Sequence, residues 1–296
     1  LGTRWRSVKC PRIFFFFLNF VVASTSQICP TCVLVNTTCY NTTFLLTLNG
    51  NFRNQVNPYD DVINKIGILR STNQLFYSFQ PDIDDKEYYK TGFVNLDDKN
   101  AWGIIVGPQI FNFRTFDIDQ DRNIVYLGGS DGIFALEIGD KMSQFTEHET
   151  ITNVFFKTDV YYTREDIKGI AVKSADVNRY LVETIIVRTF VLNKSGVVVY
   201  LNNTGLYLTK GNTLVRLSKY PFYKGIVIDL DDNVYTWWID GIYKITVENE
   251  LERSKLNMVA KLPNIGSMTF DNENNILFTS DTALYIMKPT IFGCKG

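Results

Sequence analysis

A repeated unit of short strands and turns constrains the fold of this chain more than any other feature. Each unit has an apolar strand, a turn rich in Asp and Asn, a second apolar strand, a short polar turn and a third strand. The unit is clearest in residues 114–138, 224–245 and 266–287. Repeats of roughly 40 residues made of short strands are typical of β-propellers, whereas β-solenoids usually have shorter coils. The pattern therefore favours a propeller.

The spacing of the units indicates six blades. An Asp or Asn opens the first turn at four positions: Asp119, Asn193, Asp229 and Asp271. The interval between the first two is about twice a normal repeat, so a degenerate unit is expected between them. Its strands are expected at residues 154–156, 159–163 and 169–173. Residues 66–79 have the same form about one repeat before Asp119.

The strands that complete each blade also define how the ring closes. Fourth strands are expected at residues 102–106, 181–187, 214–217 and 258–262. The last blade runs out of chain after three strands, and the apolar segment 43–48 near the N-terminus is left unassigned. We therefore predict an all-β, six-bladed β-propeller that is closed by an N-terminal strand pairing with the last blade, because this pairing removes an exposed sheet edge.

The first 26 residues carry the features of a secretory signal peptide, although the chain does not begin with Met. Basic residues precede an apolar core at residues 13–23, and small residues follow at 23–26. This core is too short to span a bilayer. We expect residues 1–26 to be removed and residues 27–296 to form a single propeller domain. The expected location is extracellular, with no membrane attachment.

Four cysteines remain after residue 26, and an even number in a secreted chain indicates two disulfides. Three lie near the mature N-terminus and one near the end of the chain: Cys29, Cys32, Cys39 and Cys294. Cys294 is expected to pair with one of the other three, and the favoured pairing is Cys29–Cys294 with Cys32–Cys39. The CxxC spacing of Cys29 and Cys32 is also that of a redox motif or half a zinc site.

Sequons suggest that the secreted chain is a glycoprotein. An Asn-x-Ser/Thr sequence begins at four positions: Asn36, Asn41, Asn193 and Asn202. The last two lie in predicted turns, where a glycan can be accommodated. Short polar turns are rich in Asn and Thr, so some of these matches can arise by chance.

Several kinds of chemistry are not indicated by the sequence. The net charge is −1 and there is no basic stripe, so no nucleic-acid partner is expected. The sequence has a single histidine, His148, and any Ser-His-Asp or Cys-His arrangement would have to use it. It lies in a polar run that is typical of a solvated loop, which does not favour a catalytic role. We predict no catalytic residues, no cofactor and no metal site. The recurring Asp and Asn turns favour side chains that cap hairpins. A bound cation is the less favoured alternative, because residues 117–123 have the opening spacing of a calcium loop but Arg122 stands where Gly is needed and Gly128 where Glu is needed.

One column of the aligned units is cationic and marks a candidate ligand site. Arg114, Arg188 and Lys224 each lie five residues before the Asp or Asn that opens the turn. Because first strands line the channel of a propeller, these residues are expected to ring one of its mouths. Trp237 and Trp238 precede a turn on the same face. Such a site suits a flat, anionic, conjugated ligand, although the tryptophans can equally pack between blades and the cations can be solvated.

Three features of the chain together point to a known family: the expected mature start at residues 29–39, the Asp-x-x-Asn-x-[Val/Ile]-[Tyr/Phe] turns and Cys294. In these features the chain resembles insect ommochrome-binding proteins. These relatives are secreted haemolymph proteins of moths and butterflies that bind yellow tryptophan-derived pigments. The resemblance implies pigment binding but places no binding residue on this sequence.

A second resemblance, at the level of the fold, is to regucalcin and gluconolactonase. In these six-bladed propellers the channel holds a metal ion bound by Glu, Asn and Asp. Possible counterparts here are Asn112, Asn153 and Asp117, but fold alone does not decide function.

Three functional hypotheses follow from these features. The leading one is a non-catalytic, secreted binding or carrier protein for a small aromatic, anionic pigment or metabolite. The first alternative is a metal-dependent hydrolase of the lactonase type. The second alternative is an extracellular propeller that binds other proteins.

Overall fold

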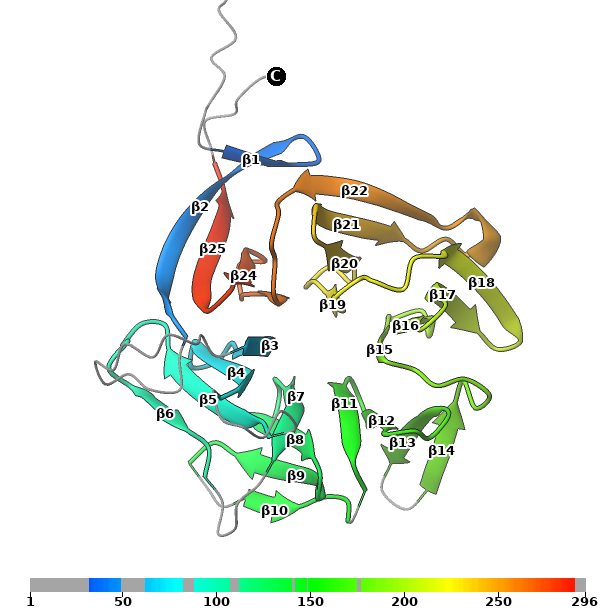
Figure 1. The fold of residues 1–296 in the computed structure, drawn as a ribbon, viewed down its shortest axis with the longest axis horizontal. Coiled ribbons are helices and arrows are strands. Elements are labelled where there is room, and N and C mark those ends of the chain that lie inside the picture. Colours follow the sequence, from blue (N-terminus) through cyan, green and yellow to red (C-terminus); the bar gives the residue numbers. More distant parts are fainter. Residues whose placement is uncertain are drawn as a thin grey trace, which may run out of the picture.

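Six sheets surround a central channel in the computed structural model of this protein (Figure 1). The structure describes residues 32–48, 62–81, 88–106, 112–139, 142–147, 149–174 and 177–290. Within these residues the only helix is the short 3₁₀ turn η1 (Leu251–Arg253). The predicted all-β, six-bladed propeller is confirmed. The predicted signal peptide (residues 1–26), Cys29, His148 and Cys294 lie outside the described residues.

The blades follow one another along the chain, each starting at the channel. Blade 1 consists of β3 (Val62–Leu69), β4 (Gln74–Gln80), β5 (Lys90–Asn95) and β6 (Trp102–Ile104). Blade 2 consists of β7 (Phe113–Asp119), β8 (Ile124–Gly129), β9 (Gly132–Glu137) and β10 (Met142–Gln144). Blade 3, the degenerate unit, consists of β11 (Ile151–Phe156), β12 (Val160–Arg164), β13 (Ile170–Ser174) and β14 (Val177–Leu181).

The second half of the ring has the same order. Blade 4 consists of β15 (Thr189–Leu192), β16 (Val198–Asn202), β17 (Gly205–Lys210) and β18 (Thr213–Ser218). Blade 5 consists of β19 (Gly225–Ile228), β20 (Val234–Trp238), β21 (Gly241–Thr246) and β22 (Lys255–Lys261). Blade 6 consists of β23 (Met268–Phe270), β24 (Ile276–Ser280) and β25 (Ala283–Pro289), followed by the N-terminal strands β2 (Thr38–Thr47) and β1 (Cys32–Val35).

The repeated Asp turns join the first and second strands and are held by their own side chains. Asp229 Oδ1 accepts hydrogen bonds from the backbone N–H groups of Asp231 (2.9 Å) and Asn233 (2.8 Å). Asp271 makes the same bonds to Glu273 and Asn275. Asp and Asn are favoured in such turns because their short side chains bond to the backbone two or more residues on. The recurring motif thus has a structural role at the ends of the inner strands.

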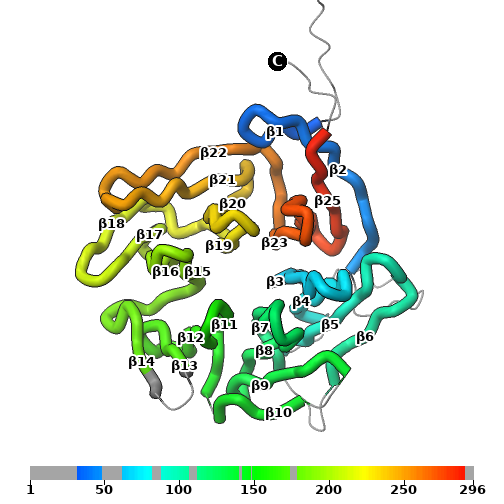
Figure 2. The backbone as a smooth tube through the Cα atoms, turned by 180° about the vertical axis from the view of Figure 1, so that it is seen from behind, coloured from blue at the N-terminus to red at the C-terminus, as the bar shows by residue number. Residues whose placement is uncertain are grey.

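Adjacent blades pack through apolar side chains that alternate along the strands. Phe76 of β4 and Phe116 of β7, for example, join blades 1 and 2, and their ring centroids are 6.3 Å apart. Both side chains are almost completely buried. Inter-blade layers of this kind leave the inner strands as the wall of the channel, which Figure 2 shows from the opposite side.

The N-terminal strand closes the ring as predicted. β2 pairs antiparallel with β25, and the Leu48 N–H continues the ladder with a 2.7 Å bond to the Thr282 carbonyl. The strand begins earlier than the expected segment 43–48, and β1 adds a further edge strand. The β1–β2 hairpin also reaches the preceding blade, where the Asn36 N–H donates to the Val259 carbonyl. Closure therefore links the last blade, the first blade and blade 5.

One predicted fourth strand is wrong. In blade 3 the fourth strand is Val177–Leu181, not residues 181–187. The apolar residues after it belong to the connection to blade 4, where Val187 is buried in the cluster between the two blades and Ile185 packs against it. The fourth strand of blade 2, β10, was not predicted from the sequence. The other expected fourth strands overlap β6, β18 and β22.

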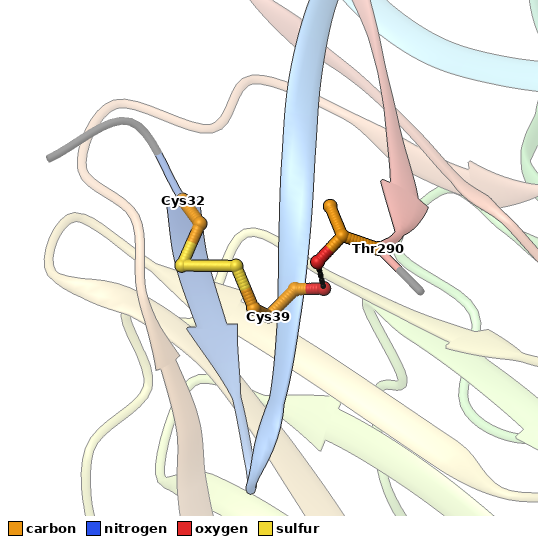
Figure 3. The surroundings of a disulfide bond; sticks show 3 residues. All are labelled: Cys32, Cys39 and Thr290. Atoms are coloured by element: carbon orange, nitrogen blue, oxygen red, sulfur yellow. Dashed lines mark hydrogen bonds between the residues drawn. A yellow bond between two sulfur atoms is a disulfide. The ribbon is translucent and has the colours of Figure 1, made fainter. Parts of the chain in front are cut away.

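A disulfide joins Cys32 of β1 to Cys39 of β2, which confirms the local half of the predicted pairing (Figure 3). Cys39 is buried, and its carbonyl accepts a hydrogen bond from the Thr290 hydroxyl at the end of β25 (3.2 Å). The bridge thus fixes the hairpin that closes the ring.

Removing this bridge is expected to destabilise the protein moderately. A cross-link that closes so short a loop stabilises by about 2–3 kcal/mol in the chain-entropy model. The double variant Cys32→Ala/Cys39→Ala should therefore show a lower urea midpoint with an unchanged slope. An unchanged midpoint would show that the hairpin is held without the bridge.

Candidate functional site

A cavity of about 940 Å³ occupies the channel and is lined by the inner strands of all six blades. Its lining includes seven Lys or Arg residues and three Asp residues. The whole chain has a net charge of −1, so positive charge is concentrated in the channel. A cavity of this size with a few charged groups is typical of a small-molecule site.

The three residues of the cationic column all line this cavity. They precede or begin the inner strands β7, β15 and β19, which run in the same direction through the channel. We call Arg114, Arg188 and Lys224 the cationic mouth. No acidic residue from this end of the channel is among the described lining residues; Glu165, 3.8 Å from Arg114, lies outside the lining.

Arg188 and Lys224 of the cationic mouth are held by backbone carbonyls but keep further donors. The Arg188 Nη2 donates to the carbonyls of Pro221 (2.7 Å) and Tyr223 (2.5 Å). The Lys224 Nζ donates to the Ile265 carbonyl (2.8 Å). Because a guanidinium has five N–H donors and an ammonium has three, both retain hydrogen-bonding capacity towards a ligand. Partial burial lowers the pKa of Arg188 from its ordinary value.

The two predicted tryptophans lie on opposite sides of β20. Trp237 lines the cavity but is only 5% exposed, and its Nε1 donates to the Gly266 carbonyl (3.1 Å). Its ring lies across Gly225, where a Cβ atom would approach it to 2.3 Å. Trp238 is absent from the lining; it packs between blades and stacks on Tyr220. Only a small part of the Trp237 ring therefore faces the channel, and Trp238 does not line the channel.

Two aromatic residues at the cationic mouth were missed by the sequence analysis. Phe222 lines the cavity and is 64% exposed, so its ring is available to a ligand. Tyr89 also lines the cavity, and the Arg114 guanidinium lies 5.4 Å from its ring centroid. Both residues belong to connections between strands, outside the repeated strand pattern that revealed the cations.

Lys65 and Asp117 occupy the interior of the channel. Lys65 lies on β3 and Asp117 on β7, in adjacent blades, and both line the cavity. Burial lowers the pKa of Lys65, and the negative charge of Asp117 partly offsets this effect. Burial raises the pKa of Asp117, and Lys65 and the Phe156 N–H partly offset that effect. Asp117 and Asn153 thus face the channel as expected, whereas Asn112 is absent from the lining and instead accepts a bond from the Tyr89 N–H.

This interior does not fit the metal site of a gluconolactonase-type propeller. Within the described residues, no group of three or more His, Cys, Asp or Glu side chains is arranged to hold a metal ion. The half-buried ammonium of Lys65 lies beside Asp117, the one acid of the channel interior. A divalent cation there would be repelled by Lys65 and would have few carboxylate ligands.

The four sequons differ in exposure. Asn36 and Asn41 are exposed on the closing hairpin, whereas Asn193 and Asn202 are each 6% exposed and bond to their own turns. Glycosylation stays a prediction, and the first two sites present the more accessible side chains. As for membrane attachment, no described segment forms a helix with the length and apolar character needed for a membrane span.

Comparison with known proteins supports both resemblances. No protein-family model matches the chain. It is 25% identical over 227 residues to the ommochrome-binding protein of Manduca sexta, which covers 73% of this chain and 80% of that protein.

Solved structures share the architecture. A gluconolactonase from Xanthomonas campestris has a TM-score of 0.63 and 5% identity, over 89% of this chain and 96% of that one. A virginiamycin B lyase from Staphylococcus aureus has a TM-score of 0.55 and 13% identity, over 84% of this chain and 99% of that one. Such low identities establish the fold and leave the function open.

Proposed function

We propose that this chain is a secreted binding protein that holds a small, planar, anionic aromatic ligand, such as an ommochrome-like pigment or metabolite, without turning it over. The observation that carries the proposal is the cationic mouth on a cavity of about 940 Å³. The similarity to the ommochrome-binding protein of Manduca sexta supports the same class of ligand.

The mouth supplies both interactions that such a ligand requires. Arg114, Arg188 and Lys224 provide donors for ligand carboxylates, since charge-assisted hydrogen bonds are stronger than neutral ones. The exposed ring of Phe222 provides a face for stacking. Without a bound anion the three like charges repel one another, so binding also relieves this repulsion.

Titration with xanthommatin tests the proposal. We expect saturable binding at one site, with quenching of tryptophan fluorescence because Trp237 borders the cavity. Trp102 lies on the outer strand β6, and the matched variant Trp102→Phe should retain most of the quenching. Affinity should fall at high salt because charges at the solvent-exposed mouth are screened. Absence of saturable binding would contradict the proposal.

The gluconolactonase architecture makes lactone hydrolysis the alternative to examine. The interior pair of Lys65 and Asp117 gives no metal-binding set, so we expect no turnover of lactones or aryl esters, with or without added divalent metal. Metal-stimulated hydrolysis that is lost in an Asp117 variant would favour the hydrolase.

A further inference from the structure

The channel interior contains two ionisable groups that the cationic mouth does not use. Lys65 and Asp117 both retain accessible surface, and both line the cavity. They are otherwise enclosed by the inner strands of blades 1, 2 and 3. Any ligand that passes the cationic mouth therefore meets these two side chains.

Their hydrogen bonds within the protein are incomplete. The Lys65 Nζ donates one bond to the Val154 carbonyl (3.0 Å), although an ammonium has three donors. The Asp117 carboxylate accepts bonds from the backbone N–H groups of Phe156 (2.7 Å) and Ile118, although a carboxylate offers about four lone-pair sites. The two groups attract each other, but these described side chains form no direct ion pair.

This arrangement favours a ligand group that hydrogen-bonds to Lys65 and Asp117 at the same time. Burying a charged group without all its hydrogen bonds is unfavourable. A hydroxyl group can accept a bond from Lys65 and donate one to Asp117. An acceptor and a donor on adjacent atoms of a ring edge can do the same.

We propose that Lys65 and Asp117 form an inner recognition pair that selects ligands carrying a hydroxyl, or an adjacent acceptor and donor, at the end opposite to their carboxylate. This inference rests on the proposed function, because the carboxylate is bound at the cationic mouth. The inference adds which end of the ligand carries which polar group, and that the end opposite to the carboxylate enters the channel first.

The strand geometry sets the length of the ligand. Arg114 and Asp117 lie three residues apart on β7, and a bulge between Phe113 and Thr115 allows both to line the cavity. At a rise of about 3.3 Å per residue this separation is about 10 Å. The inner polar group and the carboxylate should therefore be separated by about the length of a fused aromatic system.

Two related compounds provide the test: 2-naphthoate and 6-hydroxy-2-naphthoate, which differ only in a hydroxyl at the far end of the ring system. The unmodified protein should bind the hydroxy compound about ten- to a hundredfold more tightly, as hydrogen bonds to charged groups contribute that much. Isothermal titration calorimetry gives both dissociation constants, and their ratio is the quantity to compare.

Variants assign the preference to the pair. In Lys65→Met, and in the double variant Lys65→Met/Asp117→Leu, the ratio should fall below about threefold. The double variant replaces both partners by apolar groups of similar size, a change that can be nearly neutral for folding. Lys157→Met is the matched control, because Lys157 also lines the cavity but lies beyond the end of β11, where it bonds to the Leu192 carbonyl. Its ratio should stay as in the unmodified protein.

The outcomes separate this inference from the proposed function. Equal binding of the two compounds by the unmodified protein overturns the recognition pair and leaves the cationic mouth in place. A preference that persists in the double variant overturns the pair as well. Failure of the unmodified protein to bind either compound counts against the cationic mouth, and the inference falls with it.

Discussion

Leu48→Ala is expected to lower the free energy of unfolding by about 2–5 kcal/mol, the usual range for a buried Leu replaced by Ala. Leu48 is completely buried where the closing strand meets the first blade, in a cluster with Leu284 of β25 and Leu75 of β4. The substitution leaves a cavity at the point where the first and last blades are joined. Equilibrium unfolding in urea measures the loss.

Phe44→Ala, on the closing strand β2 that Leu48 directly follows, is the matched control. Phe44 is 53% exposed and makes an edge contact with Tyr285. Its replacement should cost no more than about 1 kcal/mol, since the ring buries little area. Similar losses for both variants would show that burial at the closure is not what stabilises the ring.

Arg114→Ala and Arg188→Ala are each expected to weaken xanthommatin binding about ten- to a hundredfold. The reason is the loss of one charge-assisted hydrogen bond, worth about 1.5–3 kcal/mol. Arg114 is the cleaner of the two, because its ion pair with Glu165 is long and exposed and contributes little to folding. Arg188 also orders the segment that carries Phe222, through the Pro221 and Tyr223 carbonyls. Fluorescence titration measures the affinities, and urea unfolding separates them from stability.

The control for this pair is Arg216→Ala. Arg216 is exposed on the outer strand β18, away from the channel lining. The Arg216→Ala substitution removes the same charge from the protein as the other two. Its effect on affinity should be small and should disappear at moderate salt. If all three variants weaken binding equally, the effect comes from net charge and the mouth is not the site.

The blades were predictable because their turns have a local cause. The Asp229 carboxylate, for example, accepts bonds from the N–H groups of Asp231 and Asn233 in its own turn. Because this turn needs no distant partner, its residues can be recognised in the sequence. The fourth strand of blade 3 was not predictable from apolar character. It is an outer strand, and the apolar residues that follow it, such as Val187, pack between blades from an irregular connection.

The candidate site was predictable only where it follows the repeat. The cationic mouth follows it, because Arg114, Arg188 and Lys224 hold equivalent positions at the start of the inner strands. Lys65 does not, because it is equivalent to Thr115 of β7, one position after the cationic column, and the same bulge occurs in both strands. Adjacent residues of a strand point to opposite faces, so Trp237 and Trp238 could not both reach one ligand.

A crystal structure of the complex with xanthommatin tests the central claim most directly. The account predicts that the ligand lies inside the channel, with a carboxylate bonded to at least two of Arg114, Arg188 and Lys224. A ligand bound on the outer strands, or at the opposite mouth among the Asp turns, would contradict it.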